Sequence, residues 1–117
     1  MTLAGLKILV VEDEPIIAMV LEELLEDERA IPTVASSLEQ ADDALAHATF
    51  DAAILDINVH GQKSYSIAAV LLKRGVPFVF ASGYGDTLNP DEFAHVPTVT
   101  KPYDLPTITR ALFPNRG

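Results

Sequence analysis

Short apolar segments alternate five times with longer amphipathic ones, and few folds are compatible with this order. The apolar segments are five to seven residues long and rich in β-branched or aromatic side chains, which is typical of strands. These predicted strands cover residues 7–11, 31–35, 50–56, 76–82 and 97–101. Predicted helices follow them, at residues 16–28, 38–48, 64–75, 90–95 and 106–113. Strands that alternate with helices indicate a parallel sheet with helices on both faces.

Local signals support the ends of these elements. Gly75 lies just past the third helix, and either Ser36 or Ser37 would cap the second. Asp104 would cap the last helix, which Pro106 begins. In the first helix, apolar residues recur at helical spacing, at Ile16, Met19, Val20 and Leu24.

We therefore expect an α/β fold of the flavodoxin-like kind: a doubly wound, five-stranded parallel sheet in the order 2-1-3-4-5. The fourth helix, around residues 90–95, is expected to be short or weak because it has few apolar repeats. The length suits one domain, residues 1–117, with one core and no output domain. In such folds ligands bind beyond the carboxyl ends of the strands, where the strand order reverses.

Composition and charge argue against several classes of function. The chain has no cysteine, so disulfides and thiolate chemistry are excluded. Its formal net charge is −9 without any basic cluster, which argues against binding to nucleic acid. No apolar run is long enough to cross a membrane and no signal pattern precedes the first strand, so we expect a cytoplasmic location.

Polar residues follow four of the predicted strands. Glu12 and Asp13 come after the first strand, and Asp56 ends the third. Ser82 ends the fourth strand and Lys101 the fifth. Two carboxylates about 4 Å apart repel each other by roughly 4 kcal/mol at an effective dielectric constant near 20, so a counter-charge is needed. Because carboxylate oxygens suit Mg²⁺, the set as a whole is typical of a phosphoryl-transfer site.

Four motifs carry a resemblance to a known family. They are the Glu12-Asp13 pair, ILDINVHG around Asp56, FASG around Ser82, and TKPY around Lys101. In this order, over residues 6–113, they resemble the receiver domains of bacterial two-component response regulators. The stretch PFVFASGYG followed by TKPY is also similar to a subgroup of single-domain receivers with a Phe-Ala-Thr-Gly-x-Tyr signature, known mainly from alphaproteobacteria.

The resemblance implies a role for each residue of the site. Asp56 would be the phosphoacceptor, which attacks the phosphorus of a phosphohistidine on a partner. Magnesium would be held by Glu12, Asp13, Asp56 and the main-chain carbonyl of Asn58. Ser82, in the threonine position of the subgroup signature, would bond a phosphoryl oxygen. Lys101 would pair with the phosphoryl group or, before transfer, with Asp56.

The loops around these residues carry further expectations. The resemblance implies a cis peptide between Lys101 and Pro102, which would aim the lysine. Gly61 would permit a tight turn after the Asp56 strand. Glu14 is better placed to serve the helix dipole than to bind metal. The histidines show no metal-ligand spacing, so we interpret all three as surface or loop residues: His47, His60 and His95.

The chain departs from common receivers at the position of the aromatic switch. Many receivers carry an aromatic residue three positions before the lysine, where this chain has Thr98. Tyr84 and Tyr103 are candidates to take over its role. Because the segment around residues 83–95 has weak helical signals, we hypothesise that phosphorylation orders it.

These observations predict a stand-alone receiver that switches protein contacts when phosphorylated. The phosphodonor would be a histidine kinase or a phosphotransfer protein that docks near the first helix. A downstream protein would bind the face of the fourth helix, fifth strand and fifth helix, and a homodimer through that face is an open alternative. We expect no enzymatic activity beyond the chain's own phosphorylation and dephosphorylation, and no membrane or nucleic-acid partner.

Three alternatives remain at this point. The chain would serve as a phosphate shuttle or sink in a phosphorelay, or as a small-molecule phosphotransferase that uses an aspartyl-phosphate. A flavodoxin-like nucleotide binder is disfavoured, because the carboxylates of EDEP would repel a phosphate after the first strand. From the crowding of charge, we also expect Mg²⁺ to raise the melting temperature and Asp13→Asn to stabilise the metal-free protein.

Overall fold

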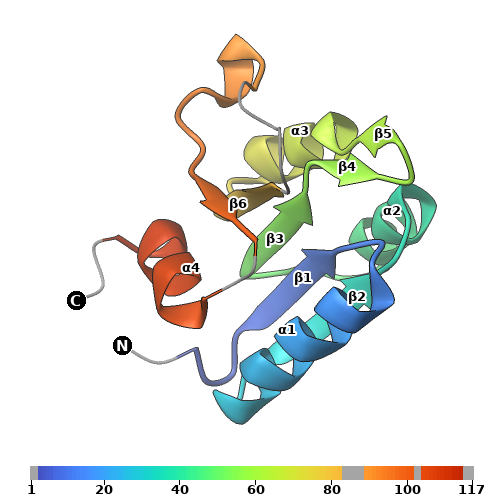
Figure 1. The fold of residues 1–117 in the computed structure, drawn as a ribbon. Helices are drawn as coiled ribbons and strands as arrows, with labels where there is room; N and C mark the ends of the chain where they lie inside the picture. Colours follow the sequence, from blue (N-terminus) through green and yellow to red (C-terminus); the bar gives the residue numbers. More distant parts are fainter. Residues whose placement is uncertain (1–2, 83–88, 102–103, 115–117) are drawn as a thin grey trace.

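The computed structural model describes residues 3–82, 89–101 and 104–114. Five parallel strands form its main sheet in the order β2-β1-β3-β6-β7, which confirms the predicted topology (Figure 1). The strands are β1 (Lys7–Val11), β2 (Ile31–Ala35), β3 (Ala52–Asp56), β6 (Phe78–Ser82) and β7 (Thr98–Thr100). All five residues of β3 and of β6 are buried, as expected for central strands of a covered parallel sheet.

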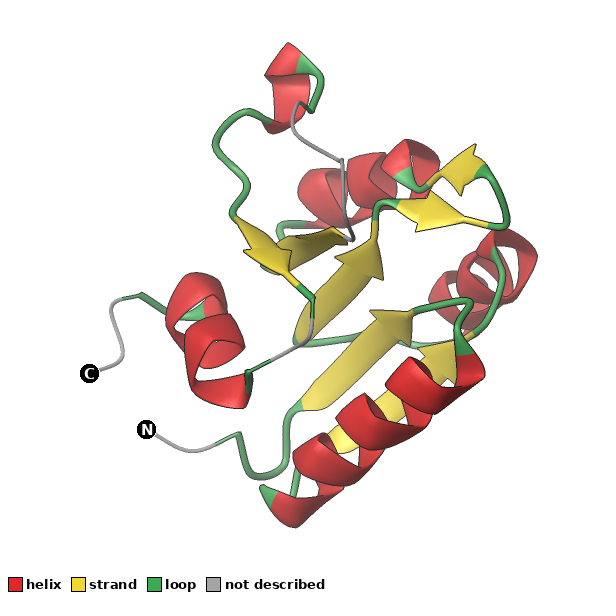
Figure 2. Ribbon diagram, in the orientation of Figure 1, coloured by secondary structure: helices red, strands yellow, loops and turns green. Residues whose placement is uncertain are grey.

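Helices cover both faces of this sheet, as Figure 2 shows. They are α1 (Pro15–Asp27), α2 (Leu38–His47), α3 (Tyr65–Arg74) and α4 (Leu105–Leu112). Alternate residues of each strand pack into two separate hydrophobic cores, because side chains along a strand point to opposite faces of the sheet. Leu9 and Leu55 pack with α2 and α3, whereas Ile8 and Ile54 pack with α1 and α4.

The predicted caps are present at the ends of the helices concerned. Ser37 begins α2 and its hydroxyl accepts a hydrogen bond from the main-chain N–H of Gln40 at 3.1 Å. Asp104 begins α4 and accepts from the N–H of Thr107 at 3.2 Å. Gly75 ends α3 with φ of 71°, a left-handed conformation that favours glycine.

A small hairpin in the loop after β3 was not predicted. Strands β4 (Asn58–Val59) and β5 (Gln62–Lys63) pair antiparallel around His60 and Gly61. Both turn residues have positive φ, 50° and 78°, which is the geometry of a two-residue hairpin turn. The strands are too short to give a periodic sequence signal, so only the need for Gly61 in the turn was foreseen.

Two other elements differ in detail from the expectation. The fourth helix is a single 3-10 turn, η1 (Asp91–Phe93), consistent with its weak sequence signal. Helix α1 forms as predicted, and two of the apolar residues at helical spacing lie at the surface: Ile16 is 74% exposed and Met19 51% exposed. Its buried residues are Ala18, Leu21 and Leu25. Among the described helices, none has the length and apolar character needed to cross a membrane.

Candidate functional site

Three carboxylates from two neighbouring strands converge at the carboxyl edge of the sheet. Asp56 is the last residue of β3, and Glu12 continues β1 by donating its main-chain N–H to Ala35 at 3.0 Å. Asp13 follows directly in the chain. Oxygens of the three acids lie within 4.8 Å of one another, while Glu12 and Asp56 are only 1% and 4% exposed.

Lys101 supplies the positive charge that this cluster needs. Its main-chain N–H donates to Ser82 at 3.0 Å, which extends the β6–β7 pairing by one residue and carries the side chain toward the acids. The Nζ atom lies 3.1 Å from Oδ2 of Asp56 and 3.0 Å from Oε2 of Glu12. The convergence of Glu12, Asp13, Asp56 and Lys101 that the strand ends predict is therefore observed.

Burial and neighbouring charge perturb the ionisation of Asp56. Burial, and then the adjacent charge of Glu12, raise the pKa of Asp56 to about 7, although Lys101 acts in the opposite direction. Burial alone would lower the pKa of Lys101, but its bonds to Glu12 and Asp56 hold that pKa above its usual range. The Lys101 ammonium therefore stays charged, beside an Asp56 side chain whose carboxyl group loses its proton less readily than an ordinary aspartic acid does.

Asp13 has a different environment, and the proximity of the other carboxylates does not raise its pKa. Its Oδ2 accepts a hydrogen bond from the main-chain N–H of His60 at 2.8 Å. Burial would raise the pKa of Asp13, but this bond and the other hydrogen bonds outweigh it, so the pKa is lowered. The folded protein thus favours charged Asp13, which argues against the expectation that Asp13→Asn stabilises the metal-free protein.

Ser82 and Asn58 lie next to the acidic cluster in the main-chain framework. Asp56 is in register with Ala81, so Ser82 is one residue further along the neighbouring strand, and it is buried. Asn58 begins β4, two residues after Asp56. Both positions agree with the expected roles in phosphoryl and metal binding, which stay predictions.

The residues proposed for switching are only partly described. Thr98 is exposed on β7, and its Oγ1 accepts a hydrogen bond from Nδ2 of Asn89 at 3.2 Å. Tyr84, Pro102 and Tyr103 lie outside the described residues, as does the predicted cis peptide before Pro102.

Sequence reasoning missed three contributors to the site. Glu14, assigned to the helix dipole, places Oε1 3.3 Å from Nζ of Lys101. His60, interpreted as a loop residue, holds Asp13 through its N–H, and its Nε2 donates to the carbonyl of Ser36 at 2.9 Å. The hydroxyl of buried Ser64 donates to the main-chain carbonyl of Asp56 at 2.6 Å. The tight turn predicted at Gly61 was the one sequence feature that could have drawn attention to His60. No sequence feature indicates that Ser64 contacts Asp56.

The donor set fits a hard divalent cation. Ligands of one Mg²⁺ ion at about 2.1 Å lie roughly 3 to 4 Å apart, and the three acid oxygens already approach this spacing. Such an ion would offset the repulsion that raises the pKa of Asp56. Glu12, Asp13 and Asp56 are therefore suited to hold Mg²⁺ with small adjustments.

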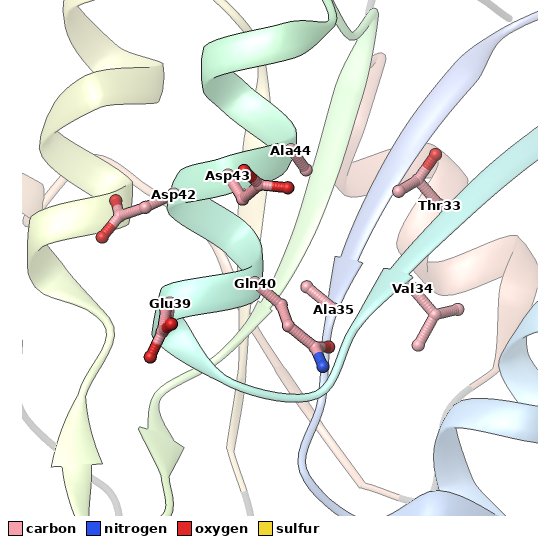
Figure 3. A pocket seen from close by; sticks show the side chains of 8 residues that line it. All are labelled: Thr33, Val34, Ala35, Glu39, Gln40, Asp42, Asp43 and Ala44. Atoms are coloured by element: carbon pink, nitrogen blue, oxygen red, sulfur yellow. The ribbon is translucent and has the colours of Figure 1, made fainter.

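A separate surface hollow lies between α2 and the edge strand β2. Figure 3 shows its lining side chains, among them Glu39, Asp42 and Asp43 on α2 and Thr33 on β2. None of the lining residues belongs to the acidic cluster, so we assign it no part in the site.

Comparison with known proteins places the chain in a family. A family model for the response regulator receiver domain matches residues 8–113. The chain is 38% identical to SdrG from Sphingomonas melonis Fr1, and their structures match over 96% of both chains with a TM-score of 0.81. A second structure, the BeF3-activated conformation of SdrG from Pseudomonas melonis Fr1, is 39% identical over 93% of this chain and 94% of that one, with a TM-score of 0.74.

A third relative has lower identity. The receiver domain of the response regulator PhyR from Erythrobacter litoralis is 26% identical over 97% of this chain and 95% of that one, with a TM-score of 0.74. A comparison with curated proteins gave no significant match. The family model covers both strand ends that supply the acids and the strand end that supplies the lysine. This chain belongs to the response regulator receiver domain family.

Proposed function

We propose that this receiver accepts a phosphoryl group on Asp56 from a phosphohistidine of a histidine kinase or phosphotransfer protein, with Mg²⁺ as cofactor. The observation that carries the proposal is the placement of the Lys101 ammonium 3.1 Å from a buried carboxylate oxygen of Asp56, beside Glu12 and Asp13. A cation fixed beside an anionic nucleophile is what transfer of a charged phosphoryl group requires.

The chemistry uses the residues of the strand ends. A carboxylate oxygen of Asp56 would form the new O–P bond as the P–N bond to the donor imidazole breaks, and the electron pair of that bond would return to the ring nitrogen. Lys101 would then bind a phosphoryl oxygen, and the Ser82 hydroxyl would donate to another. Mg²⁺, when bound by Glu12, Asp13, Asp56 and the Asn58 carbonyl, would supply further charge neutralisation.

The exposed side of α1 supports docking of the phosphodonor there. Ile16, Met19 and Val20 are 74%, 51% and 48% exposed, although apolar side chains of this size are usually buried. Helix α1 begins at Pro15, directly after the acids of the site. A partner helix that covered these three side chains would lie close to Asp56.

Output is proposed to pass through the segment that leads into β7. Asn89 links Thr98 to Tyr65, whose hydroxyl donates to Oδ1 of Asn89 at 3.3 Å. The Tyr65 ring stacks on Phe93 of η1 with centroids 5.6 Å apart. These contacts join the start of α3 to residues 89–93. We keep as a hypothesis that phosphorylation orders residues 83–95.

We also propose that the receiver acts in the cytoplasm and through contacts with other proteins. Downstream proteins, or a second copy of the chain, would bind the face of η1, β7 and α4. A role as phosphate shuttle or sink requires the same phosphorylation and differs only in the lifetime of the product.

The direct test is incubation with acetyl phosphate and Mg²⁺, followed by intact mass measurement. We expect the wild-type chain to gain one phosphoryl group and Asp56→Ala to gain none. Asp51→Ala is a matched control, because Asp51 directly precedes β3, at the end of the strand opposite Asp56. This variant should react as the wild type does. An unchanged mass of the wild type, or equal modification of Asp56→Ala, would refute the proposal. Continuous turnover of phosphate esters would instead favour a phosphotransferase.

A further inference from the structure

Ser64 occupies the N-cap of α3 but does not cap the helix. At the N-caps of α2 and α4, Ser37 and Asp104 each accept a hydrogen bond from a main-chain N–H in the first turn. Ser64 has φ of −86° and ψ of 17°, and its side chain makes no such bond. A serine at this position ordinarily stabilises a helix through its hydroxyl, so the different use of the hydroxyl needs a reason.

The hydroxyl of Ser64 is directed at the strand that carries the phosphoacceptor. Its Oγ donates to the main-chain carbonyl of Asp56 at 2.6 Å, and its N–H donates to the carbonyl of Ile57 at 2.9 Å. Ser64 has no exposed surface. Two bonds from one buried residue therefore hold the peptide units on either side of the bend that follows Asp56.

Ser64 connects the Asp56 strand to a helix that is packed in the core. Helix α3 begins at the next residue and buries Ile67, Ala68 and Leu71 in the core. Through Ser64, the main chain of Asp56 is thus tied to a packed helix as well as to its neighbouring strands. A side chain projects in a direction fixed by its own main chain, so this tie restrains the Asp56 carboxylate relative to Lys101.

We propose that Ser64 is a positioning residue for phosphorylation: its hydroxyl is withdrawn from capping α3 in order to fix the main chain of Asp56. The inference rests on the proposed role of Asp56 as phosphoacceptor. Ser64 itself touches neither the carboxylate nor the phosphoryl group. It acts by keeping the reacting oxygen in line with the incoming phosphorus, where a displacement of about 1 Å costs up to about a hundredfold in rate.

Two substitutions separate the hydrogen bond from the volume of the side chain. Ser64→Ala removes the donor, and Ser64→Cys fills the same space with only a weak donor. Ser66→Ala is the matched control, because Ser66 is exposed on the first turn of the helix that Ser64 precedes. We expect the rate of phosphorylation by acetyl phosphate at saturating Mg²⁺ to fall about tenfold in both Ser64 variants and to stay unchanged in Ser66→Ala.

A second measurement distinguishes positioning from a general structural role. Mg²⁺ affinity, followed by amide chemical shifts, should fall by a smaller factor than the rate, because two of the expected ligands, Glu12 and Asp13, follow β1 and have no described contact with Ser64. A wild-type rate in Ser64→Cys would overturn the inference, and so would a parallel loss of Mg²⁺ affinity and rate. If Ser64→Ala does not fold, Ser64→Cys alone decides. Failure of the wild type to become phosphorylated refutes the proposed function instead, before any variant is compared.

Discussion

The Nζ atom of Lys101 lies 3.1 Å from Oδ2 of Asp56, although 45 residues separate the two in sequence. The same ammonium lies 3.0 Å from Glu12, so one cation serves two buried carboxylates. A buried charge that loses its partner is much more costly than the pair itself, because it has already lost its hydration. The lysine is therefore structural in the resting protein as well as a proposed participant in phosphoryl transfer.

Replacement of Lys101 by methionine is expected to destabilise the metal-free protein at pH 8. The side chain keeps its approximate length, but Glu12 and Asp56 lose their shared counter-charge. We expect a loss of about 3 kcal/mol in the free energy of unfolding, measured by denaturant titration. Lys73→Met removes an exposed lysine of α3 and should change this free energy by less than about 0.5 kcal/mol. A loss in Lys101→Met no larger than in this control would contradict a structural role for the ion pairs.

The raised pKa of Asp56 predicts an unusual dependence of stability on pH. The folded protein binds a proton on Asp56 up to about pH 7, whereas the unfolded chain releases it near the ordinary value of 3.8. The contribution of this group is therefore fully present below about pH 4 and is lost as the pH rises through 7. A tenfold change in proton affinity corresponds to about 1.4 kcal/mol, so the loss would be on the order of 2–4 kcal/mol.

Asp56→Asn isolates this contribution from those of the other titrating groups. In the absence of Mg²⁺, the variant should gain stability relative to the wild type between pH 5 and pH 8, as measured by denaturant unfolding at each pH. A difference between the two proteins that is constant over this range would show that Asp56 titrates normally. Asp42→Asn, on the exposed side of α2, provides the control for a loss of one negative charge.

Much of the site was predictable from residue order because of the geometry of parallel sheets. Glu12, Asp56 and Lys101 each follow an apolar strand, and the carboxyl ends of parallel strands meet at one edge. The alternation of strands and helices was enough to place them together. Their mutual distances and the direction of the pKa shifts depend on side-chain packing, which residue order does not determine.

The contributors that were missed act through local main-chain geometry. His60 holds Asp13 through an N–H that every residue except proline possesses, so its identity gave no signal. Ser64 has the sequence context of an ordinary helix cap, and only the hydrogen bonds in the structure show that its hydroxyl donates to the carbonyl of Asp56. The exposure of Ile16 and Met19 could not be predicted for another reason: their helical periodicity does not tell which side of α1 faces the sheet.

Magnesium is expected to raise the melting temperature of the protein, because the ion binds only the folded arrangement of acids. At a concentration one hundred times the dissociation constant, the gain would be about 2.7 kcal/mol. Asp13→Asn should weaken this response, since it removes one carboxylate ligand, while Asp42→Asn should leave it intact. A melting temperature that does not change at millimolar Mg²⁺ would show that the metal assignment is wrong.

Beryllofluoride, which mimics the phosphoryl group, is expected to increase hydrogen-exchange protection within residues 83–95. Phosphorylation at Asp56 would draw the end of β6 toward the site and restrain the segment that follows it. The measurement is exchange followed by mass spectrometry, with and without beryllofluoride and Mg²⁺. Equal protection in the two states would exclude the ordering hypothesis. Asp56→Ala, which lacks the acceptor, should show no response in either case.

Tyr65→Phe tests whether contacts with α3 hold the same segment in the resting protein. The variant loses the hydroxyl that bonds Asn89 but keeps the ring that stacks on Phe93. One hydrogen bond contributes about 1 kcal/mol, so amides of residues 91–96 should exchange about fivefold faster without beryllofluoride. Phosphorylation of Asp56 by acetyl phosphate should proceed at the wild-type rate, because Tyr65 contacts neither the acids nor Lys101 among the described interactions. Unchanged exchange would mean that the Tyr65 hydroxyl does not hold residues 91–96 in the resting protein.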